Sequence, residues 1–492
     1  MKRAFNVCSI FLLAAVAAML LSGCSTFISA HSQKKGMMKM YGGGYYSRAY
    51  TEAADYMKSR QDTGDELMWL MECGMITFAQ ERYKESLDYF NRAEAVAEDY
   101  ENRATINLRG AMSEVGAAYT NQNVLPYEGD FFEKILINYY KALNYYALGE
   151  PEAAGVELRR VRYRQKNAER DFQEDVYKVT SENYSTVGSQ LSGNEIMSND
   201  RVVSDKSALA VKCNNKLGLY LNPAVSFLSA AVYLRDNNYN EALVDYRKLY
   251  FVDDGNPFFR RGLVTCAREI GSNPPEELAK EAPYDFKLAE DSVFIIFENG
   301  LAPAREERLV ELILPPPVGY IGFAYPVLKF FPDKIKNVKF YGSGNLEIGD
   351  TMKFSDMEQI IANDLSNDMP IILQRALISI MVKEATSISL QIAAQQIPHV
   401  GDAARLMVFI GASIAKKAVN RADTRCWETL PQEYQCSLFK RPNDGIVKVC
   451  LIGDDGNVID NATLNLGSRP GLKLILLKSN GFGSFNLKLF EM

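Results

Sequence analysis

A recurring pattern of paired helices constrains the fold of this 492-residue chain more than any other feature. In each pair, small residues let two helices approach closely, and a large aromatic residue fills the space toward the neighbouring pair. Because such a pair cannot bury its apolar face alone, we expect several pairs to stack into a helical solenoid. The pattern predicts three pairs, at Leu67–Asp99, Ile135–Lys166 and Pro223–Asp254.

The first pair shows the pattern most clearly. Gly74 is expected where its two helices touch, and Ser86, Phe90 and Ala93 occupy small, large and small positions of its second helix. In the second pair, Gly149 is expected at the turn. This spacing resembles the tetratricopeptide repeat (TPR), which implies a solenoid with a concave groove that binds peptides or protein segments.

Two sets of residues are candidates for binding a partner in such a groove. Tyr139 and Tyr145 belong to an aromatic-rich stretch of the second pair. Arg159, Arg162 and Lys166 follow helical spacing and predict a basic stripe for an acidic partner. The alternative is structural, because aromatic residues at helical spacing normally pack between helices and charge runs normally form solvated faces.

The start of the chain has the parts of an export signal. Lys2 and Arg3 precede an apolar stretch, Ser9–Leu21, which is shorter than the roughly 20 residues that a membrane-spanning helix needs. A pair of small residues follows and leads into Cys24, and this arrangement resembles the lipobox of bacterial lipoproteins. The resemblance implies cleavage before Cys24 and acylation of its thiol, so that fatty acyl chains hold the protein on a membrane.

These features predict the division of the chain. We expect residues 1–23 to be a lipoprotein signal peptide and residues 24–44 to be a lipidated tether. Ser25, a non-acidic residue after the cysteine, favours the outer membrane, with the body of the protein facing the periplasm. Residues 45–282 form the predicted TPR-like domain, interrupted by an exposed loop at 182–206 that is rich in Ser, Asn and Gly.

Composition changes after residue 282. Short apolar runs bounded by Gly and Pro predict β-strands within residues 283–492, with helices between them. The predicted fold class is therefore α+β, with an N-terminal all-α, TPR-like solenoid followed by a mixed α/β C-terminal domain. The uncharged run Leu406–Ala415 has about half the length needed to cross a bilayer, so a buried helical hairpin is expected there.

Composition also disfavours several classes of function. The chain has two histidines, His31 and His399, so neither a catalytic triad nor a histidine metal site is expected. Loss of Lys2 and Arg3 with the signal changes the net charge from -6 to about -8, which disfavours nucleic acid as a ligand. Nucleophile motifs and phosphate-binding loops do not stand out, so the sequence predicts neither an enzyme nor a cofactor.

Six cysteines remain when Cys8 of the signal and Cys24 are set aside, and none forms a C-x-x-C motif. Thiols outside the inner membrane can oxidise, and Cys426 and Cys436 are ten residues apart, so this pair is the candidate disulfide. The alternative is that these cysteines are single buried thiols, which pack as small apolar side chains.

Four further segments have a distinctive sequence, at Tyr127–Lys134, Glu157–Arg160, Glu298–Pro303 and Ala422–Trp427. They resemble a family of uncharacterised bacterial lipoproteins with tetratricopeptide-like helices. The resemblance covers most of the mature chain, from about Gly44 to the region of Trp427, and implies an envelope location, but it brings no catalytic residue. Cys426 stands where the family pattern has serine, so a bridge to Cys436 would be peculiar to this sequence.

Together these observations predict a lipid-anchored adaptor or scaffold that binds another envelope protein through its groove. Confinement to one membrane surface would raise the effective concentration of the partner. The alternative is an accessory lipoprotein that binds cell-wall glycan or peptidoglycan, with Trp427 and neighbouring tyrosines stacking on sugar rings.

Overall fold

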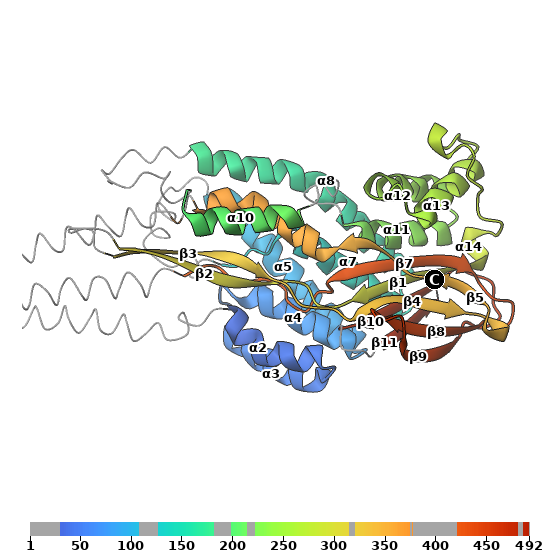
Figure 1. The fold of residues 1–492 in the computed structure, drawn as a ribbon, viewed down its shortest axis with the longest axis horizontal. Coiled ribbons are helices and arrows are strands. Elements are labelled where there is room, and N and C mark those ends of the chain that lie inside the picture. Colours follow the sequence, from blue (N-terminus) through green and yellow to red (C-terminus); the bar gives the residue numbers. More distant parts are fainter. Residues whose placement is uncertain are drawn as a thin grey trace, which may run out of the picture.

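The computed structural model describes residues 30–107, 126–181, 198–213, 222–313, 320–373, 376, 421–480 and 486–491. Helices occupy the first part of this chain and strands the second, so the fold is α+β, as predicted. Figure 1 shows an elongated molecule with the sheets gathered at one end and a long two-stranded ribbon extending toward the other.

Helix pairs form at the three predicted places. They are α4 (Glu66–Ala79) with α5 (Tyr83–Asn107), α7 (Phe131–Ala147) with α8 (Pro151–Ser181), and α11 (Pro223–Arg235) with α12 (Tyr239–Val252). Helices α4 and α5 touch at Gly74, where an added Cβ would lie 2.7 Å from the Phe90 ring. Gly149 follows α7 with φ of +77°, a left-handed conformation that favours glycine at a helix end.

Further helices flank these pairs. They are α2 (Ala30–Gly42), α3 (Tyr46–Arg60), α10 (Asp200–Lys212), α13 (Pro257–Glu269), the short α14 (Leu288–Asp291) and a helix over residues 357–373. Asparagine side chains begin α11, α12 and α13 by accepting backbone N–H groups of the first turn, which would otherwise lack partners; they are Asn222, Asn238 and Asn256.

The strands form two stacked sheets and the ribbon. The five-stranded sheet has the order β11-β10-β1-β7-β6, in which only β1 and β10 are parallel, and the antiparallel four-stranded sheet has the order β5-β4-β8-β9. The strands are β1 (Ser292–Asn299), β2 (Ala304–Ile313), β3 (Tyr320–Lys329), β4 (Ile335–Tyr341), β5 (Glu347–Asp350), β6 (Met352–Asp356), β7 (Glu433–Lys440), β8 (Ile446–Gly453), β9 (Val458–Asn465), β10 (Lys473–Ser479) and β11 (Asn486–Glu491).

β1 is buried on both faces because its alternate side chains enter different cores. Val293 and Phe297 pack between the two sheets. Phe294 points to the opposite face, where its ring centroid lies 5.2 Å from that of Phe227 on α11. The helices and the five-stranded sheet therefore share one apolar core.

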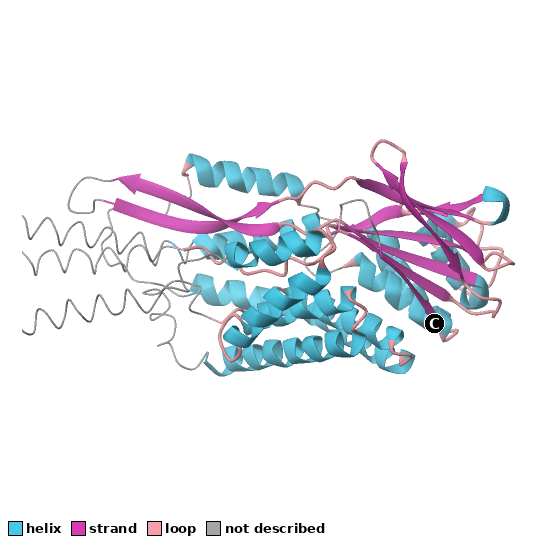
Figure 2. Ribbon diagram, turned by 90° about the horizontal axis from the view of Figure 1, so that it is seen from below, coloured by secondary structure: helices cyan, strands magenta, loops and turns pink. Residues whose placement is uncertain are grey.

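The ribbon of β2 and β3 extends away from the sheets in both views (Figures 1 and 2). A two-stranded hairpin is marginally stable in water when nothing packs against it. Here Val310 and Phe323 of the ribbon share a small core with Leu209 of α10 and Leu365 of the helix over residues 357–373. These two helices therefore support the ribbon.

Two boundary predictions are wrong. Residues 30–42 are not a tether, because they form α2 and bury Lys34 and Tyr41 against the body. Residues 200–206 of the predicted loop belong to α10, which packs through Leu209 against the ribbon. In both cases the helix is stabilised by contacts with distant segments, which a local sequence pattern does not reveal.

None of the helices in the described ranges has the length and apolar character needed to cross a membrane. The run Leu406–Ala415, for which a buried hairpin was expected, lies outside the described residues. Residues 1–29, with the predicted signal and Cys24, and residues 182–197 of the predicted loop lie outside them as well.

Candidate functional site

Buried charged side chains meet where the ribbon, α7 and the helix over residues 357–373 come together. The side chain of Arg305, at the start of β2, is 9% exposed. Its guanidinium lies 2.9 Å from the carboxylate of Asp130, the N-cap of α7, and 3.5 Å from that of Asp364. We name this cluster the junction and define it as Arg305, Asp130, Glu133, Asp364 and Asp368.

Three carboxyl groups of the junction converge. Asp364 and Asp368 are one helical turn apart, and each places an oxygen within 4.8 Å of the other and of Asp130. Burial raises the pKa of Asp130 and of Asp364, although Arg305 opposes this effect. These carboxyl groups have the spacing to hold a metal ion, but Arg305 already contacts two of them. The arrangement is that of a structural ion network.

Glu133 connects the junction to the segment 421–432. One carboxylate oxygen accepts the Tyr127 hydroxyl at 2.6 Å and the Asp130 N–H at 3.0 Å, and the other accepts the Trp427 N–H at 2.7 Å. Burial and the neighbouring Asp130 carboxylate raise the pKa of Glu133 to about 7. Glu133 is therefore expected to take up a proton at a higher pH than an exposed glutamate does.

The segment 421–432 also reaches α4. Arg425 lies 2.7 Å from Asp423 and 3.1 Å from Asp65, which precedes α4. Trp427 is 1% exposed, and its ring centroid lies 5.6 Å from that of Phe90. The prediction that Trp427 stacks on sugar rings is wrong, because α5 and its neighbours cover the indole.

A second group of buried charges attaches α2 to the body. The Lys34 ammonium lies 3.0 Å from a carboxylate oxygen of Glu72 on α4 and 3.0 Å from one of Glu428. Burial alone would lower the pKa of Lys34, but Glu428 and Glu72 raise it above its ordinary value. His31, one turn earlier, lies 3.0 Å from Glu428 and 3.6 Å from Glu306 of β2.

The structure brings together three of the four segments on which the predicted resemblance to a lipoprotein family rests. Tyr127–Lys134 supplies two members of the junction, Ala422–Trp427 hydrogen-bonds to it, and Glu298–Pro303 leads into the strand that contains Arg305. Glu157–Arg160 lies elsewhere, where Glu157 pairs with the buried Lys141 at 3.1 Å. Structural contacts inside the protein therefore account for the distinctive sequences of these segments.

Sequence reasoning missed the junction. Asp130 and Glu133 have the three-residue spacing of a helix capping box, and the structure forms that box. Asp364 and Asp368 have the four-residue spacing that puts two side chains on one helix face. Neither local signal indicates that the two pairs meet, or that Arg305 lies between them.

Tyr139 does not line the predicted aromatic groove. This side chain is fully buried, and its ring centroid lies 6.0 Å from that of Tyr434 on β7. Tyr145 is partly buried and packs against the same core. The prediction for Tyr139 is wrong because the five-stranded sheet covers this part of α7. Tyr139 is a core packing residue, which is the alternative given for the aromatic residues.

The three residues of the predicted basic stripe on α8 differ in their contacts and exposure. Arg162 pairs with Glu241 and Asp245 of α12, and its guanidinium carbon lies 4.3 Å from the centre of the Tyr233 ring. It therefore joins two helix pairs and is not a free binding residue, contrary to prediction. Arg159 and Lys166 are exposed and form no ion pair with any residue that the structure describes.

Arg159 and Lys166 share their side of α8 with two exposed apolar residues. Tyr163 is 70% exposed and Val156 is 40% exposed. The four residues follow one another at intervals of three or four, so they lie along one helix face. We name Val156, Arg159, Tyr163 and Lys166 the α8 face.

Cys426 and Cys436 are free thiols, and both are buried. The candidate disulfide is therefore not formed, and the alternative of single buried thiols describes both residues. Cys436 belongs to the interior strand β7, whereas Cys426 lies in the segment over the junction, where burial raises its pKa to about 12.

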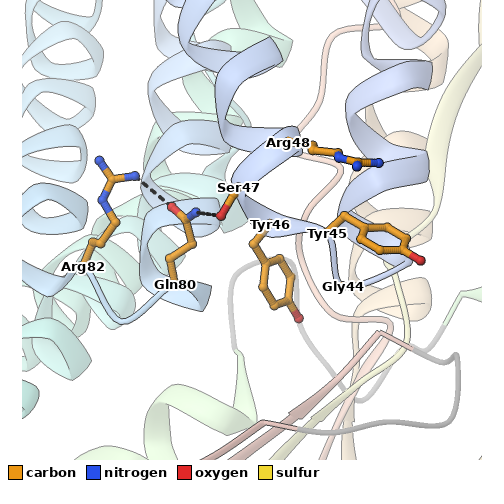
Figure 3. Close-up of a pocket in the computed structure, with 7 residues that line it drawn as sticks. All are labelled: Gly44, Tyr45, Tyr46, Ser47, Arg48, Gln80 and Arg82. Carbon is orange, nitrogen blue, oxygen red and sulfur yellow. Dashed lines mark hydrogen bonds between the residues drawn. The ribbon is translucent and has the colours of Figure 1, made fainter.

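An open pocket of about 610 Å³ lies between the start of α3 and the turn from α4 to α5 (Figure 3). Tyr45 is 63% exposed, and the Arg48 guanidinium carbon lies 5.7 Å from the centre of its ring. The Gln80 side chain donates to the Ser47 hydroxyl at 3.2 Å and accepts from Arg82 at 2.9 Å. An aromatic ring, cationic groups and neutral polar groups thus surround the open space.

Comparisons with protein-family models, with curated proteins and with solved structures find no match for this chain. The resemblance to a lipoprotein family and the acylation of Cys24 therefore stay predictions.

Proposed function

We propose that the chain is a lipid-anchored envelope adaptor, held on a membrane through acylated Cys24 and facing the periplasm. Its helix pairs are proposed to be units of a TPR-like solenoid. The main support for a protein partner is the α8 face, where part of the predicted basic stripe remains exposed beside an exposed tyrosine. The mechanism is equilibrium binding, strengthened by confinement to one membrane surface, and it requires no reaction.

The chemistry of the α8 face favours an acidic protein segment as partner. Arg159 and Lys166 lie on either side of Tyr163 along the helix, so spaced carboxylates can pair with both while an apolar side chain covers the ring. Tyrosine and arginine are enriched at the energetic centres of interfaces. Arg160 and Arg164 contribute less, because both already pair with Glu94.

Charge reversal tests this proposal. The doubly substituted Arg159→Glu, Lys166→Glu protein and the Tyr163→Ala protein are compared with the wild type by crosslinking in native membranes and mass spectrometry. We expect the yield of the crosslinked partner to fall about tenfold or more, which corresponds to about 1.4 kcal/mol of binding free energy.

Phe251→Ala is the matched control, because Phe251 on α12 is 69% exposed and lies outside the α8 face. Its partner yield is expected to equal that of the wild type. Equal yields from every variant would contradict a role for the α8 face.

A second candidate function, binding of cell-wall glycan, is favoured by the pocket beside α3. Tyr45 presents an exposed ring to stack on a sugar, and Arg48 presents a cation to a carboxylate of an acidic sugar. Co-sedimentation with purified sacculi separates the two functions. If glycan is the ligand, Tyr45→Ala and Arg48→Ala reduce sedimentation and Tyr163→Ala does not.

A further inference from the structure

Strand β9 is one edge of the four-stranded sheet, and no described strand pairs with its outer side. The main-chain groups of an edge strand can pair with another extended chain, and natural edge strands are commonly protected by lysine, proline or a β-bulge. β9 contains no Lys, Arg or Pro, and the irregularity in its pairing with β8 falls at Ile459. Residues 460–465 are therefore a regular and accessible edge.

The main-chain groups of Thr463 and Asn465 point away from β8. The Asn461 N–H donates to the carboxylate of Asp460 at 2.8 Å, whereas the Leu466 N–H donates at 2.8 Å to the carbonyl of the residue before β8. The N–H groups of alternate residues in a strand point to the same side, so those of Thr463 and Asn465 lie on the outer side with that of Asn461. They are placed to pair with an added strand.

The pairing with β8 determines which β9 side chains face the core between the two sheets. Directly opposite residues share a face of the sheet, and Val447, Val449 and Leu451 of β8 are buried in that core. Their partners on β9 are Leu464, Ala462 and Asp460, in that order. The side chains that face inward along this edge are therefore apolar, small and acidic.

The margin of the two sheets beside β9 has incompletely covered leucines. β4 lies over β7, because the ring centroids of Phe340 and Phe439 are 5.2 Å apart, and β5 leads directly into β6. The strand orders then place β9 on the side of β11, as Figure 1 shows. Leu464 of β9 and Leu487 and Leu489 of β11 are only partly buried at the border of the core. A strand added to β9 would extend over them.

Asp460 makes this edge selective. An inward-facing charge on an edge strand opposes pairing with a strand that offers it no counterion. Asp454 and Asp455, in the turn before β9, add negative charge at the same end, and none of these three aspartates forms an ion pair with a residue that the structure describes. Opposite charges that face each other across two strands stabilise the pair, so a basic residue complements this end.

We propose that β9 binds an extended segment of a partner protein, which adds to the four-stranded sheet as a fifth strand. The segment carries a basic residue opposite Asp460 and apolar residues opposite Ala462 and Leu464. This surface is separate from the α8 face and does not require acylation of Cys24. A second copy of β9 fits less well, because pairing two copies with their inward faces on one side places Asp460 opposite an apolar residue or opposite the same aspartate.

Two synthetic peptides test the proposal with the purified full-length protein. In both, threonine alternates with leucine, valine and a charged residue, in that order; one peptide carries lysine and the other carries glutamate. Hydrogen exchange by mass spectrometry follows β9 as each peptide is added. We expect the lysine peptide to slow exchange in β9 and not in β5, at the opposite edge. Half-maximal protection is expected at a concentration about fivefold lower than with the glutamate peptide.

Asp460→Lys is expected to reverse this preference, so that the glutamate peptide protects β9 at the lower concentration. Partial unfolding cannot produce such a reversal. Asp285→Lys, at another exposed aspartate, is the matched control and is expected to keep the wild-type preference. Thr463→Pro removes an outward N–H, a change that an edge strand tolerates, and is expected to abolish protection by both peptides.

Three results would overturn the proposal. If neither peptide protects β9, no strand is added there. If Asp460→Lys leaves the preference unchanged, Asp460 does not select the partner. If β9 becomes protected without peptide as the protein concentration rises, and sedimentation shows a dimer, the edge belongs to a second copy of the chain. The glutamate peptide can also pair with the α8 face, but protection measured in β9 reports the edge alone.

Discussion

The guanidinium of Arg305 lies 2.9 Å from the carboxylate of Asp130, and this ion pair joins the start of the ribbon to the N-terminus of α7. Both side chains are mostly buried, with 9% and 11% of their surface exposed. Water therefore cannot replace either partner, and removal of one leaves the other as a buried charge without its counterion. We expect this contact to be important for the attachment of the ribbon to the helices.

Arg305→Ala is expected to lower the free energy of unfolding by about 3–5 kcal/mol, because Asp130 and Asp364 lose their shared counterion. Urea unfolding followed by circular dichroism measures this change. The control is Arg308→Ala, since Arg308 is 46% exposed and pairs with Asp205 on the surface, where loss of a pair costs less than about 1 kcal/mol. Similar losses in the two variants would argue against the junction as a stabilising centre.

The stability of the protein is expected to fall as the pH rises from about 4.5 to above 7. Burial and Asp130 raise the pKa of Glu133 from 4.5 to about 7, and burial also raises the pKa of Asp130 and Asp364. The folded protein thus binds protons in this range that the unfolded chain releases, so deprotonation favours unfolding. Urea unfolding at a series of pH values between these limits measures the slope.

Glu133→Gln is expected to make that slope shallower, because an amide does not ionise yet still offers an oxygen to the Trp427 N–H. The variant is also expected to be less stable than the wild type at low pH. When its amide oxygen accepts the Trp427 N–H, its amide nitrogen faces the Asp130 N–H, and two donors cannot form a hydrogen bond. An unchanged slope would show that Glu133 does not titrate in this range.

Gly74→Ala is expected to lower the free energy of unfolding by about 1–3 kcal/mol, because its Cβ would lie 2.7 Å from the Phe90 ring and the first helix pair would separate. Gly155→Ala in α8 is the matched control. There the nearest atom is the end of the flexible Arg159 side chain at 3.5 Å, so alanine is expected to stabilise the helix by up to about 1 kcal/mol. Thermal unfolding of the two variants distinguishes these opposite effects.

Lys34→Met is expected to release α2 from the body, since Glu72 and Glu428 would remain buried without their counterion. Hydrogen exchange by mass spectrometry is expected to show faster exchange in α2 and little change in α11 and α12. Lys35→Met, at an exposed position of the same helix, is expected to leave exchange in α2 as in the wild type. Equal protection of α2 in both variants would contradict its attachment through Lys34.

Local patterns predicted the helices and strands well, because they depend on the spacing of small, apolar and turn-forming residues within one segment. The pair around Gly74 and Phe90 and the turn at Gly149 formed as predicted. The same patterns were misleading for α2, whose Lys, Gly and Met residues indicate no clear apolar face. α2 is helical and buried because its partners Glu72 and Glu428 come from other parts of the chain.

The sequence by itself determined the α+β order of helices and strands, the three helix pairs, and the exposure of Arg159 and Lys166 as part of a basic stripe. Only the tertiary structure decided that Tyr139 is buried, that Arg162 joins two helix pairs, and that Asp130 and Asp364 meet at Arg305. The physical reason is that periodicity depends on neighbours within one segment, whereas burial and ion pairing depend on which distant segments pack together.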